Sequence, residues 1–234
     1  MVDIPIRGEL WDNDSSDILR WWGWRDITAP MDIEQALRDA NGDDVTVLVN
    51  SPGGDMVVGG EIRSMLRRYS GNVTALIQGH AASAATLAIS ACRTIRCEPG
   101  ALLCYHNPSG SAEGDHREMS RAAAGLLSAR DCILEMYEAR GGTKPRDELI
   151  ELMDRDTWIS PTEAKEYGLI DEIVALEGLG GDPAAFVAAA DGRIRLTAHM
   201  REEYQAHIAA ERERAATEEK ARRARAKLRA LANY

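Results

Sequence analysis

Two short runs of apolar, mostly β-branched residues constrain the fold more than any other feature of the chain. Residues 45–49 (VTVLV) and 73–77 (VTALI) are each followed by a turn rich in small residues and then by a helical pattern. A continuous apolar run of this length is typical of a strand buried in a parallel sheet. Because strand and helix patterns alternate in this way as far as residue 175, the sequence predicts an α/β domain with a largely parallel sheet.

Periodicity, caps and turn residues predict the remaining elements. Further strands are expected at 2–10, 94–97, 101–105 and 170–174, and helices at 57–66, 115–140, 146–153, 161–167 and from Pro30, with Thr28 as the cap of this last one. The polar stretch 12–17 predicts a loop. Trp21, Trp22 and Trp24 lie within four residues, which is typical of core or subunit-interface packing or of a peptide-binding surface.

The chain's composition excludes several classes of protein. Its 234 residues, 44% apolar and 28% charged, suffice for one full core and an appendage. The net charge of −10 argues against non-specific nucleic-acid binding by the main domain. No run of eighteen apolar residues exists, so we expect no transmembrane helix and no membrane partner. The N-terminus lacks a signal-peptide pattern, which predicts a cytoplasmic protein.

Three segments differ in composition. Residues 1–177 form the predicted α/β domain, residues 178–197 are rich in Gly, Ala and Asp and predict a linker, and residues 198–234 predict a charged helical extension. Apolar positions are sparse in this extension, so a solvated or partner-docked helix is expected.

The four cysteines show no pattern of metal binding. Cys92, Cys97, Cys104 and Cys132 have neither CxxC spacing nor histidines at zinc-ligand intervals. We therefore expect buried free thiols and no metal.

Ser83 is the first candidate for chemistry. It follows the strand at 73–77 in the segment GHAASAA (79–85) and precedes an alanine-rich run, an order that predicts strand, tight turn and helix. A serine at the first helical turn can expose its hydroxyl beside unpaired amides that suit an oxyanion. The alternative is an ordinary N-cap, because serine is also a preferred capping residue.

The segment NSPGGD (50–55) follows the strand at 45–49. Proline and paired glycines predict a sharp turn with exposed amides, and the amides of Gly53 and Gly54 are candidate donors to a reacting carbonyl. A simple strand-to-helix turn explains the glycines equally well.

A serine nucleophile needs a base and an orienting acid. His106 ends a strand predicted to neighbour the one that leads to Ser83, so both can lie at one sheet edge. His80 is expected to flank the pocket. Asp156 follows a helix and precedes an apolar pair that would fix it against the core. Single His and Asp residues at element ends are also common as caps or surface groups.

Four segments together resemble the Clp-type serine peptidases in order and spacing: NSPGGD (50–55), GHAASAA (79–85), YHNPSG (105–110) and DRDTWISPTEAKEYGLIDEI (154–173). The resemblance covers residues 4–175. Within that family the sequence is most similar to the phage head-maturation (prohead) protease branch. Four motifs support this placement: ITAP near the N-terminus, GGD after the proline, HNP around the histidine, and TW after the aspartate.

The resemblance implies roles for individual residues. Ser83 matches the nucleophile, His106 the general base and Asp156 the orienting acid, while Gly54, with Gly53 beside it, and Ala84 match the oxyanion-hole amides. It also implies a crotonase-like spiral of ββα units. The helix at 115–140 is then expected to make contacts between rings, in a homo-oligomer that is often heptameric and stacked.

The function that the resemblance implies is cleavage of peptide bonds without a cofactor. A head-maturation protease would process scaffold or capsid proteins. The alternatives are the proteolytic subunit of an ATP-dependent housekeeping protease, a non-catalytic scaffold or assembly protein, and an acyl-CoA enzyme of the crotonase superfamily. Ala84 stands where the family often has Met, and the loop 108–114 differs in detail, which leaves substrate preference open.

Overall fold

The computed structural model describes residues 2–141 and 143–175. The chain divides into two compact units, Met1–Glu177 and Gly178–Tyr234, and all described residues belong to the first. The predicted linker at 178–197 and charged helix at 198–234 lie outside the described residues and stay predictions.

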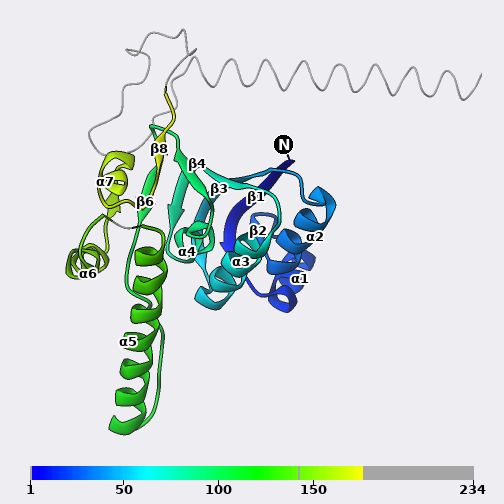
Figure 1. The fold of residues 1–234 in the computed structure, drawn as a ribbon. Helices are drawn as coiled ribbons and strands as arrows, with labels where there is room; N and C mark the ends of the chain where they lie inside the picture. The colour runs from blue at the N-terminus through cyan, green and yellow to red at the C-terminus, as the bar shows by residue number, and fades with distance from the viewer. Residues whose placement is uncertain (1, 142, 176–234) are drawn as a thin grey trace, which may run out of the picture. The chain divides into compact units, whose positions relative to one another are not determined.

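An eight-stranded sheet forms the centre of the first unit (Figure 1). Its strands are β1 (Val2–Leu10), β2 (Ile27–Thr28), β3 (Val45–Gly54), β4 (Val73–Ala82), β5 (Thr94–Cys97), β6 (Leu102–Cys104), β7 (Trp158–Ile159) and β8 (Glu172–Ile173). The order is β2-β1-β3-β4-β5-β8, and β6 pairs with β4 and with β7. Among the described strands only β6 and β7 pair antiparallel. The prediction of a largely parallel α/β sheet is therefore confirmed.

The helices are α1 (Asn13–Trp21), α2 (Pro30–Ala40), α3 (Met56–Arg68), α4 (Ala84–Ile89), α5 (His116–Ala139), α6 (Arg146–Arg155) and α7 (Pro161–Glu166). Burial alternates along β3 and along the first half of β4, so one face of each strand points into the core, as expected for a pleated strand. That face packs with apolar residues of the helices in one cluster, which includes Ile33, Ile62 and Leu87.

The loop predicted at 12–17 is wrong, because helix α1 occupies most of it. Asp12 caps this helix by accepting a hydrogen bond from the Ser15 N–H at 2.9 Å. The only buried residue of α1 is Ser16, whose hydroxyl donates to the Asn13 carbonyl. The helix therefore lacks the buried apolar stripe from which a helix is normally recognised in a sequence.

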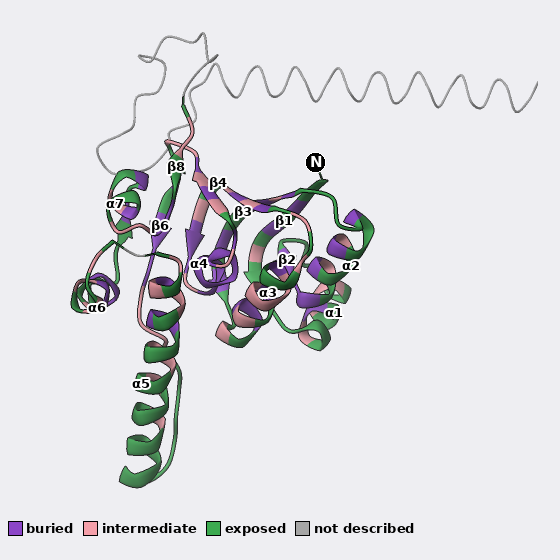
Figure 2. Ribbon diagram, in the orientation of Figure 1, coloured by how far each residue is buried: buried purple, intermediate pink, exposed green. Residues whose placement is uncertain are grey.

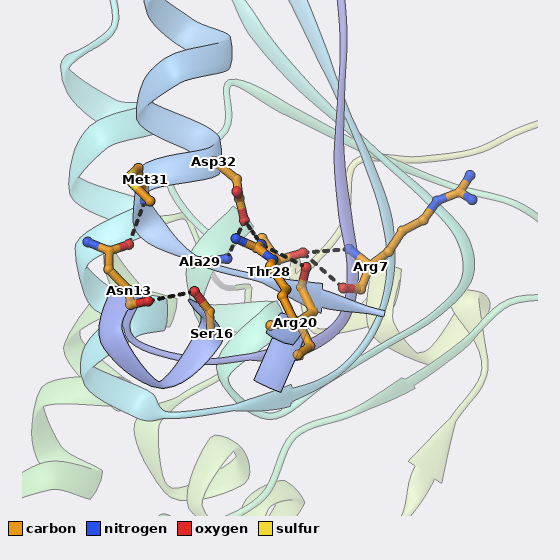
Figure 3. Close-up of polar contacts among 9 residues, drawn as sticks. Arg7, Asn13, Ser16, Arg20, Thr28, Ala29, Met31 and Asp32 are labelled. Carbon is orange, nitrogen blue, oxygen red and sulfur yellow. Dashed lines mark hydrogen bonds and ion pairs between the residues drawn. The ribbon is translucent and has the colours of Figure 1, made fainter. Parts of the chain in front are cut away.

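Polar contacts join α1, β2 and α2 into one corner (Figure 3). Arg20 forms an ion pair with Asp32, and Asp32 also accepts from the Ala29 N–H. The Thr28 hydroxyl donates to the Arg7 carbonyl and accepts from the Arg7 N–H. The N-cap of α2 is Ala29, so the prediction that Thr28 caps this helix is wrong: Thr28 contacts the neighbouring strand instead.

The tryptophan cluster does not pack into the core of this chain. Trp21, Trp22 and Trp24 are 81%, 72% and 60% exposed, and the first two rings form an edge-to-face pair. Core packing is therefore wrong for these residues. A subunit interface or a peptide-binding surface stays a prediction.

Helix α5 has the predicted bounds and begins with Asp115 as its N-cap, in a capping box with Glu118. Only its C-terminal third contributes buried residues, Ile133, Leu134 and Tyr137. Met119 and Leu127 fit the 3.6-residue apolar period of this helix, yet both are exposed. Figure 2 shows the resulting helix, mostly green along its length, extending away from the sheet.

The described cysteines are all free thiols. Cys92, Cys97 and Cys104 are buried, as predicted, but Cys132 on α5 is exposed. Burial raises the pKa of the Cys92 and Cys97 thiols to about 12, and burial together with the Asp156 charge raises the pKa of Cys104. No helix among residues 2–141 and 143–175 is long and apolar enough to cross a membrane.

We expect a thiol reagent such as Ellman's reagent to modify one cysteine quickly at pH 8 and all four after denaturation. The reagent reacts with thiolates, and only Cys132 combines solvent access with an unburied sulfur. The Cys132→Ser variant should lose the fast phase. A fast phase that persists in this variant would contradict the burial of the other three thiols.

Candidate active site

Ser83 lies in a strained connection between β4 and α4. Its backbone angles are φ 53° and ψ −130°, a region that costs a non-glycine residue roughly 1–3 kcal/mol. The Ser83 N–H donates to the Cys104 carbonyl at 3.0 Å, and the Ser83 carbonyl accepts from the Thr86 N–H and hydroxyl. The tight turn predicted from residue 79 onward is wrong in extent, because β4 continues to Ala82 and Ser83 alone connects it to α4.

The position of Ser83 matches an N-cap, yet its side chain makes no capping hydrogen bond. An ordinary capping serine uses its oxygen to accept from the second or third amide of the helix. Here the backbone carbonyl of Ser83 accepts from Thr86 instead. The hydroxyl is therefore available for a ligand, which favours the nucleophile over the simple cap.

The hydroxyl-bearing turn opens into a cavity of about 310 Å³. The lining residues are Gly54, Asp55, Met56, Ser83, Ala84, Leu87, His106, Asn107, Pro108, Ser109, Ile133 and Tyr137. The cavity thus collects the ends of β3 and β4, the segment after β6, and the buried end of α5. Ser83, His106, Gly54 and Ala84, predicted from sequence, all line it.

Gly53 and Gly54 belong to the end of β3, so the sharp turn predicted here is replaced by a strand that ends at the Asp55 cap of α3. Both glycines have positive φ, 95° and 149°. A Cβ on Gly53 would meet the Ala82 carbonyl oxygen at 2.6 Å and the Ser83 Cβ at 2.7 Å. The glycine therefore allows the two strand ends to approach closely.

Replacing Gly53 with alanine should lower both stability and any activity of this cavity. The new methyl group would collide with the β4–α4 connection at positive φ, and overpacking and strain each cost about 1–3 kcal/mol. We expect a loss of about 2–5 kcal/mol in the free energy of unfolding by denaturant titration. Gly60 in α3 has open space at its Cβ position and no positive φ, so Gly60→Ala should not destabilise the chain. Equal stability of the two variants would refute the close approach.

His106 is brought to the same cavity by the pairing of β4 with β6. In this parallel ladder Ala82 lies opposite Cys104, so the residues that follow both strands emerge at one edge of the sheet. The prediction that the strand ending at His106 neighbours the one leading to Ser83 is confirmed. Among the described residues, however, no hydrogen bond joins the His106 ring to the Ser83 hydroxyl.

Asp156 does not line the cavity. It is the exposed C-cap of α6 in the left-handed conformation, with φ 45°. The β6–β7 ladder ends at the pair Cys104–Trp158, and His106 and Asp156 each lie two residues beyond that pair. The Asp156 charge also raises the pKa of the Cys104 thiol, after the larger effect of burial. The carboxylate therefore lies near the end of β6, two residues before His106 in the chain.

Two hydrogen-bonded pairs near the cavity were not predicted from the sequence. The Asn107 amide donates to Asp154 Oδ1 at 2.7 Å, and the hydroxyls of Thr86 and Tyr137 lie 2.8 Å apart in the interior. Asn107 stands within the HNP motif, but nothing in the motif indicates its partner. Tyr137 fits the apolar period of α5, so the sequence gives no signal of its polar contact.

His80 does not line the cavity, contrary to the prediction that it flanks the pocket. Its ring lies edge-to-face on Trp158, with centroids 6.0 Å apart. The described residues contain no group of three or more His, Cys, Asp or Glu side chains placed to hold a metal ion.

Comparison with known proteins assigns the family. The profile described as "Clp protease" matches residues 33–177. The chain belongs to the Clp protease family. It is 33% identical over 172 residues to the chloroplastic ATP-dependent Clp protease proteolytic subunit 3 of Arabidopsis thaliana. The matched segment covers 71% of this chain and 54% of the relative. It thus spans little more than half of that relative's length.

A bacterial relative and a solved structure extend this comparison. The ATP-dependent Clp protease proteolytic subunit 3 of Rhizobium johnstonii is 33% identical over 141 residues, 59% of this chain and 72% of the relative. A ClpP1 mutant from Listeria monocytogenes superimposes with a TM-score of 0.59 at 22% identity, covering 74% of this chain and 90% of that one. This similarity confirms the predicted Clp protease α/β fold.

Proposed function

We propose that this chain is a serine endopeptidase in which Ser83 is the nucleophile, His106 the general base and Asp156 the residue that orients the histidine. The observation that carries the proposal is that the Ser83 hydroxyl makes no capping hydrogen bond and lies on a strained connection in the same cavity as His106. Membership of the Clp protease family supports it.

In the proposed reaction the Ser83 oxygen attacks the carbonyl carbon of the scissile peptide bond while His106 takes the hydroxyl proton. His106 then gives this proton to the leaving amine, and the C–N bond breaks to leave an acyl-enzyme. Water attacks the ester in a second round, with His106 again as the base, and restores the free serine. The His106 ring must approach the hydroxyl for the first step, as is common when apo geometry tightens around a substrate.

The oxyanion that forms needs amide donors, and Gly54 and Ala84 are the best candidates. Both line the cavity with Ser83. The Ala84 amide belongs to the first turn of α4, where amides lack partners within the helix. The Gly53 amide already donates to the Ser51 hydroxyl at 3.1 Å, so Gly53 acts through its shape and Gly54 as the donor.

A fluorophosphonate probe tests the proposal directly. The probe should form a covalent bond with the Ser83 oxygen, and peptide mapping should place the label there. Labelling would exclude both a non-catalytic assembly protein and an acyl-CoA enzyme, neither of which needs an activated serine. An absence of label on the assembled, folded chain, or label on another serine, would refute the assignment.

Two biological settings are compatible with this activity. The names of the relatives favour a peptidase that acts together with an ATP-driven unfoldase. The ITAP, GGD, HNP and TW motifs instead favour the cleavage of scaffold or capsid proteins during phage head maturation. Cleavage of a folded substrate that requires an added Clp ATPase and ATP would establish the first setting. Cleavage of scaffold protein without nucleotide would establish the second.

We also propose that the chain works as a homo-oligomeric ring. Helix α5 supports this proposal, because its N-terminal two thirds are mostly exposed among the described residues and its Met119 and Leu127 side chains face solvent. A helix 24 residues long with so little buried surface needs a partner for its exposed apolar groups. Mass photometry of the full chain would measure the ring size.

A further inference from the structure

The cavity that contains Ser83 carries one carboxylate that the proposed mechanism does not use. Asp55 lies directly after Gly54, between the candidate oxyanion donor and helix α3, and it lines the cavity with Ser83 and His106. Apart from His106 and Tyr137, the other residues of the lining have no ionisable side chain. The cavity therefore has a negative side.

Capping engages only part of this carboxylate. Asp55 Oδ1 accepts from the Val57 N–H at 2.6 Å and from the Val58 N–H at 3.3 Å. No Lys or Arg among the described residues forms an ion pair with Asp55, and the side chain is exposed. Within residues 2–141 and 143–175 the charge thus has no cationic partner.

The rest of the lining explains why a charge here selects a substrate. Met56, Leu87, Ile133 and the Tyr137 ring provide apolar walls, on which the aliphatic stem of a long side chain can pack while its charged end reaches a carboxylate at the rim. A peptide in the cavity also displaces water, which strengthens the attraction between opposite charges.

We infer that Asp55 is a specificity-determining residue that selects polypeptides with Lys or Arg close to the scissile bond. The inference rests on the proposed peptidase function and concerns which peptides are cleaved, not the bond-breaking step. The Asp55 carboxylate binds the ammonium or guanidinium group, and the adjacent Gly54 amide binds the carbonyl oxygen under attack. One short segment, 54–55, then aligns both features of the substrate.

The test compares matched peptides on the full chain. Each pair carries either lysine or acetyl-lysine at one of the three positions on either side of the scissile bond, so the aliphatic stem is kept while the positive charge is removed. We expect the wild type to prefer lysine at one position, measured as the ratio of kcat/KM values. Asp55→Asn should reduce this ratio about fivefold, the effect typical of a solvent-exposed ion pair. The variant should keep its fold, because asparagine caps a helix as well as aspartate does.

Asp115→Asn provides the matched control, since Asp115 caps α5 in the same way and does not line the cavity. It should keep the wild-type ratio. The lysine preference of the wild type should also fall between 0.05 and 1 M salt, which shortens the Debye length from more than 10 Å to about 3 Å, so the inference is testable even if Asp55→Asn folds poorly.

The outcomes separate the two proposals. Cleavage of both peptide sets without a lysine preference, or a preference that Asp55→Asn and salt leave unchanged, would overturn the role of Asp55 while the peptidase stands. No cleavage of any peptide and no labelling of Ser83 by the fluorophosphonate probe would overturn the proposed function, and the role of Asp55 with it.

Discussion

Ser83→Ala should lower peptide cleavage by at least about 10⁴-fold, because the variant has no oxygen to form the acyl-enzyme and loses the covalent pathway. Folding should change little. Serine and alanine pay a similar cost for the φ 53° conformation at position 83, because neither is glycine. The hydroxyl that is removed makes no capping hydrogen bond. The rate is measured with a fluorogenic peptide, and circular dichroism and mass photometry report the fold and the assembly.

Ser109 provides a control in the same cavity. It lines the cavity with Ser83 but follows no strained turn and adjoins no helix N-terminus. Ser109→Ala should therefore keep most of the activity and remain labelled by a fluorophosphonate probe. If Ser109→Ala lost activity and labelling while Ser83→Ala kept both, the nucleophile would have been misassigned.

The proximity of Ser83 and His106 could be predicted from the sequence. Both follow strands whose apolar runs are readable, and parallel neighbours end at the same edge of a sheet. The β4–β6 register, with Ala82 opposite Cys104, confirms that expectation. The long helix at 115–140 was equally readable, because an aspartate–glutamate capping box and a Gly141 that follows its end mark its limits.

The sequence was insufficient where structure depends on contacts rather than on pattern. Helix α1 buries only Ser16, so no apolar period signals it, and polar groups such as the half-buried Asp32 hold the α1–α2 corner. Pro52 and the two glycines of 50–55 predict a turn. They instead permit β3 to continue, with a register shift against β4 between Val49 and Ser51, which a local reading of turn residues cannot distinguish.

The last residue of the proposed triad is the sharpest test of this geometry. Asp156→Asn should reduce kcat/KM about 10⁴-fold, as expected when a catalytic histidine loses the carboxylate that fixes its tautomer. The structure motivates this prediction in two ways: Asp156 and His106 each lie two residues beyond the last pair of the β6–β7 ladder, and burial together with the Asp156 charge raises the pKa of the Cys104 thiol. Steady-state assays with the same fluorogenic peptide measure the loss, and the KM should change less than kcat because no substrate contact is removed.

Asp154 is the rival acid, since it lies two residues away and the amide of Asn107, the neighbour of His106, donates to it. If Asp154 orients the histidine through Asn107, then Asp154→Asn should cause the large loss and Asp156→Asn a small one. Asn107 reaches Asp154 through its side-chain amide, but among the described residues no hydrogen bond joins Asn107 or Asp154 to the imidazole of His106, so we expect Asp154→Asn to cost less than tenfold. The relative rates of these two variants decide which carboxylate completes the site.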